Sequence, residues 1–117
     1  MITGDHLLAM LSAACSALED NEEAVNSLNV FPVPDGDTGT NMLLTMRSSA
    51  KEAGTVINPD ASSVASAAAK GGLMGARGNS GVILSQVLRG ISSSFEGRTQ
   101  VDGSTLAAAL SRASEMA

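Results

Sequence analysis

The chain has 117 residues, which allows one domain at most. Its formal net charge of −5 argues against nucleic acids and anionic membranes as partners. Only 2% of the residues are aromatic while 44% are apolar, so the core must be built from Ala, Leu, Val, Ile and Met. Such small side chains suit helices that approach each other closely.

The sequence carries no sign of a membrane span or of a secretory signal. No apolar run approaches the length that a membrane crossing needs, and the N-terminus lacks a signal-peptide pattern. Cys15 has no second cysteine to pair with, which fits a reducing cytoplasm. We therefore expect a cytoplasmic protein without a membrane span, and the sequence leaves open a homo-oligomer.

The first predicted helix begins after Thr3, a plausible N-cap. Its apolar residues recur at helical spacing and form one stripe: Leu7, Leu11, Ala14, Cys15 and Leu18. We expect the helix to pause near Asp20 and Asn21 and then to resume, burying Val25 and Leu28.

The stretch from Asn29 to Met42 (NVFPVPDGDTGTNM) carries the strongest functional signal. Its two prolines, Pro32 and Pro34, exclude an ordinary helix or central strand and predict a stiff strut. Asp35 and Asp37 follow, and a turn at the glycine between them can bring both carboxylates to one point. Because two carboxylates repel each other, this arrangement favours a Mg²⁺ ion. An Asp-rich capping turn is the structural alternative.

Three known acidic or phosphate-binding patterns do not fit this stretch. An EF-hand loop starting at Asp35 would need Gly in place of Thr40 and Glu in place of Met46. A Walker A loop is absent from the whole chain. An aspartyl nucleophile of the haloacid-dehalogenase type follows a buried strand, and prolines occupy that position here.

The second helix is predicted from Gly39 or Thr40 to Ala53, with Gly54 as its C-cap. Its N-terminus would direct free N–H groups at the acidic loop, which favours a phosphate. Three side chains there are candidate phosphate donors, with helix capping as the alternative: Thr38, Thr40 and Asn41. The next helix is predicted to start at Asn58-Pro59-Asp60, with the proline in its first turn, and to run through Lys70.

A glycine-rich stretch, residues 71–81, then opens an apolar helix over residues 82–88. A glycine-rich turn before a helix is typical of a phosphate cradle. The candidate phosphate contacts are Gly78, Asn79, Ser80 and Gly81, with Arg77 either neutralising charge or solvated at the rim. Close helix–helix contact is the alternative role for the glycines.

The last predicted helix is capped by Asp102 or Ser104 and has four inward residues: Leu106, Ala109, Leu110 and Ala113. No stop signal precedes Ala117, so we expect a piece of a longer protein.

Two segments of the sequence, LNVFPVPDGDTGTNM (residues 28–42) and LMGARGNSGVILSQ (residues 73–86), together resemble the DhaL-like nucleotide-binding domain. The closer similarity is to the version at the N-terminus of bacterial fatty acid kinases. The resemblance implies an all-α fold, an antiparallel up-and-down helical barrel with eight helices in the full domain. Residues 1–117 would be the N-terminal portion of this ATP-binding kinase domain, with about five helices.

The resemblance also implies a site and a reaction. ATP or ADP would bind at one end of the barrel with two Mg²⁺ ions, held by Asp35 and Asp37, which would also be the catalytic residues. Asn29 lies in the region where relatives that phosphorylate dihydroxyacetone have a third aspartate, so we expect Asn29 to be the third metal ligand or its water-mediated substitute. The implied acceptor is a fatty acid carboxylate on a DegV-like binding protein. Dihydroxyacetone phosphorylation and a nucleotide-binding or scaffolding module without turnover remain as alternatives.

Overall fold

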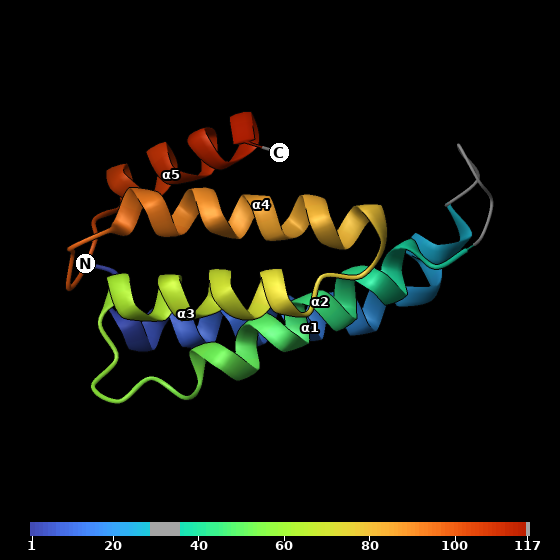
Figure 1. Cartoon of the computed structure of the whole chain (residues 1–117), viewed down its shortest axis with the longest axis horizontal. Helices are drawn as coiled ribbons and strands as arrows, with labels where there is room; N and C mark the ends of the chain where they lie inside the picture. The colour runs from blue at the N-terminus through green and yellow to red at the C-terminus, as the bar shows by residue number, and fades with distance from the viewer. Residues whose placement is uncertain (29–35, 117) are drawn as a thin grey trace.

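The computed structural model describes residues 1–28 and 36–116, and these residues form five α-helices (Figure 1). In chain order they are α1 (Gly4–Ser27), α2 (Thr38–Ala53), α3 (Ala61–Met74), α4 (Gly78–Phe95) and α5 (Gly103–Met116). The only β pairing in this described part is a single bridge between Ile2 and Val101. The all-α prediction is therefore confirmed.

Successive helices run antiparallel along an elongated bundle that measures 42 × 27 × 22 Å. Each helix packs against the next one in the chain, and α1 also contacts α3 while α2 also contacts α4. Figure 1 shows the consequence of this alternation: the N-termini of α1, α3 and α5 lie at one end, and those of α2 and α4 lie at the other.

At the first of these ends, each helix is capped by the residue before it. The Thr3 hydroxyl accepts from the backbone N–H of His6 at 3.2 Å, as a predicted N-cap should. Asp60 and Asp102 cap α3 and α5 in the same way, each accepting a backbone N–H at 2.7 Å. The prediction that Pro59 lies in the first turn of α3 was wrong, because the extended Asp60 provides the cap and the proline precedes it.

Close contacts between helices depend on glycines and small hydroxyl residues. Gly71 and Gly72 lie in the last turn of α3, which extends beyond its predicted end at Lys70. A methyl group added to Gly71 would lie 2.5 Å from the Ser48 carbonyl oxygen on α2. The alternative role, close helix contact, therefore applies to Gly71. The Ser49 hydroxyl, fully buried between α2 and α3, donates to the Ala68 carbonyl at 2.8 Å.

Two predictions for α1 were wrong. The helix is continuous through residues 20 and 21, since neither breaks a helix and the Asn21 side chain donates to the Ala17 carbonyl one turn earlier at 2.7 Å. Leu28, expected in the core, is 77% exposed because it follows the end of the helix. Val25 is half-buried.

The five helices form an open rather than a closed arrangement, because α1 and α5 do not pack against each other in the described part of the chain. An apolar groove of about 330 Å³ is lined by residues of all five helices. Leu110, predicted to face inward, borders this groove and remains 51% exposed. An open five-helix arrangement is consistent with part of a larger helical domain. None of the described helices has both the length and the apolarity required to traverse a bilayer.

Candidate functional site

The N-termini of α2 and α4 meet at the second end of the bundle, and both stretches singled out by the sequence lie there. The α-carbon of Gly78 faces the side-chain amide of Asn41, so closely that any β-carbon at residue 78 would collide with it. Gly78 also has a φ of +66°, a conformation that favours glycine. The Ser80 hydroxyl donates to the Thr38 carbonyl at 3.4 Å. The structure thus brings two distant sequence motifs together.

These two helix starts differ from the three at the opposite end. The N-cap residues are Asp37 for α2 and Arg77 for α4, and neither side chain makes a capping hydrogen bond. The N-terminus of a helix carries a partial positive charge and directs N–H groups outward. Two such ends, not capped by their own side chains and side by side, are suited to binding an anion.

Thr45 joins α2 to the turn before α4. Its hydroxyl donates to the Asn41 carbonyl at 2.8 Å and accepts from the Arg77 backbone N–H at 3.2 Å. The residue is fully buried, and the α-carbon of Gly81 packs directly against its hydroxyl. Gly81, predicted to contact phosphate, is therefore placed in a tight helix contact.

Asp37 is half-buried at the start of α2. Gly36, immediately before it, has a φ of +69°, which fits the turn predicted at this glycine. The other two predicted metal ligands, Asp35 and Asn29, lie outside the described residues. Within residues 1–28 and 36–116 no three His, Cys, Asp or Glu side chains cluster as metal ligands.

Thr40, predicted as a phosphate contact, faces α1 instead. Its hydroxyl donates to Oε2 of Glu22 at 2.8 Å and accepts from Nδ2 of Asn26 at 3.0 Å. Its backbone N–H donates to Oδ1 of Asn26 at 3.1 Å. Sequence reasoning missed Glu22 and Asn26, because polar residues on a helix are usually solvated. Their separation of four residues, which places them on one helix face, was the only available signal.

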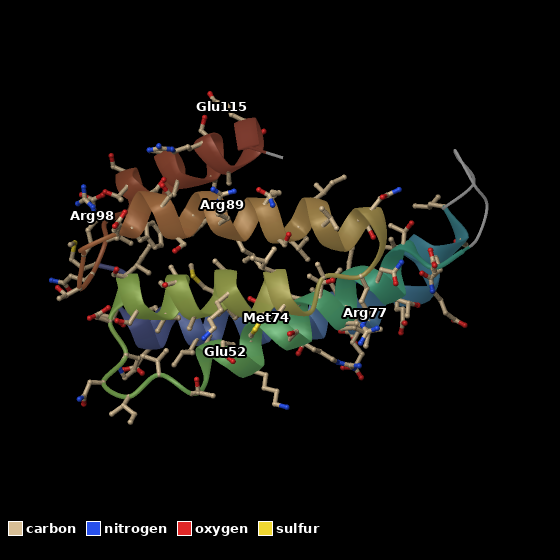
Figure 2. The ribbon with its side chains drawn as sticks, in the orientation of Figure 1. Glu52, Met74, Arg77, Arg89, Arg98 and Glu115 are labelled. Atoms are coloured by element: carbon tan, nitrogen blue, oxygen red, sulfur yellow. The ribbon has the colours of Figure 1, made fainter. Side chains whose placement is uncertain are left out.

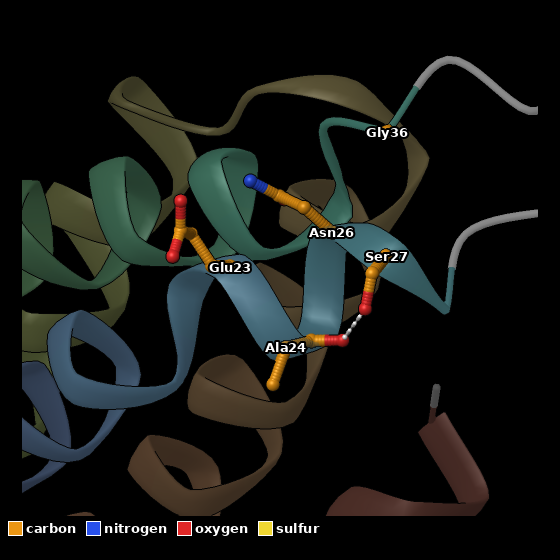
Figure 3. A pocket seen from close by; sticks show the side chains of 5 residues that line it. All are labelled: Glu23, Ala24, Asn26, Ser27 and Gly36. Atoms are coloured by element: carbon orange, nitrogen blue, oxygen red, sulfur yellow. Dashed lines mark hydrogen bonds between the residues drawn. The ribbon is translucent and has the colours of Figure 1, made fainter.

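A shallow hollow of about 690 Å³ lies beside the contacts of Thr40 with α1, between the end of α1 and Gly36 (Figure 3). It is lined by Glu23, Ala24, Asn26, Ser27 and Gly36. In Figure 3 the Ser27 hydroxyl turns back to the Ala24 carbonyl, with which it makes a hydrogen bond of 2.8 Å. The hollow is open to solvent and adjoins the start of α2.

Positive side chains are distributed along the whole bundle. Figure 2 shows Arg77 close to α2, whereas Arg98 lies at the end with the capped helix starts. Arg47 on α2 pairs with Glu19 on α1 at 3.5 Å, on the exposed surface. Arg77 is thus the arginine adjacent to the α4 N-terminus, and its side chain is exposed.

Comparison with known proteins identifies the family. The profile of the DAK2 domain matches residues 32–117. Protein YloV of Bacillus subtilis (strain 168) is 49% identical over 116 residues, which cover 99% of this chain and 21% of that protein. An uncharacterized protein of Staphylococcus aureus (strain USA300) is 44% identical over 106 residues, which cover 91% of this chain and 19% of that protein. The chain therefore spans about a fifth of the length of these relatives. With most of its length matched by that profile, the chain belongs to the DAK2 domain family, which is related to kinases.

Proposed function

We propose that this chain is the N-terminal portion of a nucleotide-binding domain, residues 1–117, in an ATP-dependent kinase. The observation that carries the proposal is the meeting of two helix N-termini beside Asp37, neither capped by its own N-cap side chain. The three helix starts at the far end are capped by Thr or Asp side chains, so the difference is specific to one end. Membership of the DAK2 domain family supports a kinase-related role.

The proposed Mg²⁺ site is supported by the chemistry of the acidic residues in and before the start of α2. The Asp37 carboxylate is not used to cap α2, and Asp35 precedes it by two positions in the sequence. Mg²⁺ is usually held by one or two carboxylates together with substrate phosphates and water, which is the donor set proposed here. The resemblance adds a second ion and Asn29 as a further ligand. When bound, Mg²⁺ would neutralise charge on the β- and γ-phosphates.

The other proposed contacts belong to the two helix starts. Backbone N–H groups at the start of α4, with the side chains of Asn79 and Ser80, would hold the phosphates of ATP or ADP. Thr38 and Asn41 would add donors from α2. Such donors act by positioning the phosphoryl group and stabilising its charge, which accounts for most catalysis in phosphoryl transfer.

The proposed reaction transfers the γ-phosphoryl group to a fatty acid carboxylate. The bond between the γ-phosphorus and its bridging oxygen breaks, a bond to a carboxylate oxygen forms, and the products are ADP and an acyl phosphate. This step requires no covalent nucleophile from the chain. The acceptor, its DegV-like carrier protein and a cytoplasmic setting are drawn from the resemblance. Dihydroxyacetone phosphorylation is the second candidate, and a binding or scaffolding module without turnover is the third.

Calorimetric titration of the chain with ATP, with and without Mg²⁺, tests the binding step. We expect Mg²⁺-dependent binding that is lost in Asp37→Asn and retained in Asp20→Asn, a control that removes an exposed carboxylate on α1. Equal binding by both variants would remove Asp37 from the metal site. An assay of ATP consumption with carrier-bound fatty acid or with dihydroxyacetone then separates the candidates, and binding without turnover would favour the module.

A further inference from the structure

We propose that Glu22 and Asn26 on α1 are positioning residues that set the affinity of the site for Mg²⁺-bound nucleotide by holding the α2 N-terminus through Thr40. This inference rests on the proposed function, because the affected step is the binding of nucleotide. It assigns Thr40 a role as a joint between two helices rather than as a phosphate contact.

The hydrogen bonds at this joint form one mutually consistent set. The Thr40 hydroxyl has a single proton, which it donates to Glu22, and it accepts the Asn26 amide proton with a lone pair. The Asn26 oxygen accepts the Thr40 backbone N–H. Each donor therefore meets an acceptor, and the carboxylate of Glu22 makes one of the bonds charge-assisted.

The joint also caps α2 from outside. Thr40 is the third residue of α2, and its N–H is one that an N-cap side chain ordinarily accepts. Asn26, from another helix, accepts it instead. The carboxylate of Asp37, the N-cap residue itself, is left out of capping and stays available for the proposed metal site.

Gly39 shows how closely the two helices approach here. It is buried, and a methyl group on it would lie 2.6 Å from the Glu22 carbonyl oxygen and 3.0 Å from Oδ1 of Asn26. The last turns of α1 and the first turn of α2 are therefore in direct contact. Loss of the side-chain bonds would let the start of α2, with Asp37 and Thr38, shift relative to α4. A misplacement of about 1 Å can cost up to roughly 100-fold in the rate of a catalysed reaction, so the geometry of this helix start matters to the site.

Paired variants separate positioning from folding. Thr40→Val and Glu22→Ala remove hydrogen bonds, whereas Thr40→Ser and Glu22→Gln preserve an equivalent donor or acceptor. Asp20→Ala removes an exposed charge from the same helix as a control. For each variant we would measure the dissociation constant for ATP with saturating Mg²⁺, the melting temperature without ligand, and amide exchange at Thr40 by NMR.

We expect Thr40→Val and Glu22→Ala to bind Mg²⁺-ATP at least ~10-fold more weakly. Thr40→Ser and Glu22→Gln should bind within about threefold of wild type, and Asp20→Ala should match it. Equal affinity of Thr40→Val, Thr40→Ser and wild type would overturn the inference, as would losses that follow melting temperature across all variants.

Amide exchange of Thr40 in the absence of ligand tests whether the contacts between α1 and Thr40 form. The Thr40 N–H should be protected in the wild type and exposed in Asn26→Ala, and unprotected exchange in the wild type would also overturn the inference. If the wild type binds no Mg²⁺-ATP, the proposed function fails and the affinity role fails with it. Protection lost in Asn26→Ala would then still support the helix joint alone.

Discussion

Replacing Gly71 with alanine should destabilise the bundle, although alanine is the better helix former. The added methyl would lie 2.5 Å from the Ser48 carbonyl oxygen and 2.6 Å from Cβ of Glu52, whereas ordinary contacts begin at 3.4 Å. The nearest atom belongs to the backbone, so α2 and α3 must move apart by about 1 Å. Overpacking of this kind typically costs about 1–3 kcal/mol. Strain on the bond from the Ser48 hydroxyl to the Gly71 carbonyl adds roughly 1 kcal/mol.

The higher helix propensity of alanine offsets about 1 kcal/mol of this cost, so the net loss should be about 1–3 kcal/mol. Urea denaturation followed by circular dichroism measures it, with Gly103→Ala as the matched control because no atom lies within 4 Å of a methyl group there. The control should be neutral or slightly stabilising. A Gly71→Ala variant as stable as Gly103→Ala would show that the α2–α3 contact is not as close as described.

Three further outcomes follow from the described contacts. Thr45→Val should lower the free energy of unfolding by about 1–3 kcal/mol, because it leaves the partners of a buried hydroxyl unpaired, while Thr45→Ser should retain most of the stability in the same urea assay. Asp60 and Asp102 each accept a hydrogen bond from a backbone N–H, and this bond holds the pKa of each carboxyl below its ordinary value. Because the folded pKa is lowered, this stabilisation is present at neutral pH and is lost as the pH falls through that pKa. Asn is an equally good cap but carries no charge, so replacing both aspartates with Asn should reduce the drop in urea midpoint between about pH 7 and pH 3. Burial raises the pKa of the Cys15 thiol, against a smaller opposing effect of Arg47, so iodoacetamide at mildly alkaline pH should modify Cys15 more slowly in the folded chain than in urea.

Local sequence signals predicted some helix boundaries and missed others: the glycine-rich stretch predicted as a turn is helical at both ends, since α3 runs to Met74 and α4 spans Gly78–Phe95 rather than residues 82–88. Thr3 and Asp102 cap the helices that they were expected to cap, and Gly54 ends α2 as predicted. These features depend on neighbouring residues alone, because a cap bonds a backbone group two or three positions away. The turn at Gly36, with its positive φ, also depends on local sequence alone.

Tertiary contacts were beyond such signals. Thr45 and Ser49 are fully buried, although an apolar stripe on α2 would not include them. Their hydroxyls are satisfied by carbonyl oxygens, one in the same helix and one in α3, so burial leaves no polar atom unpaired. Leu28 was predicted to be buried because it continues the helical periodicity of α1, but the helix ends at Ser27 and Leu28 is exposed.

For the candidate site, the structure brings together the two motifs that the sequence singled out, and the phosphate and metal contacts of their residues stay predictions. The Asn41 and Ser80 regions meet as expected at two helix starts. Thr40 instead joins α2 to Glu22 and Asn26, and this partner choice depends on the packing of α1 against α2. A residue type can predict a hydrogen-bond donor, but only the packing decides what accepts from it.

The most direct test of the central claim is an NMR titration of the isotope-labelled chain with Mg²⁺-ATP. The account predicts that the largest amide shifts occur at residues 36–41 and 78–81, where the two helix starts meet. The capped starts near Ser63 and Thr105 should remain unchanged. Shifts concentrated at those capped starts, or no shifts at any nucleotide concentration used, would contradict the account.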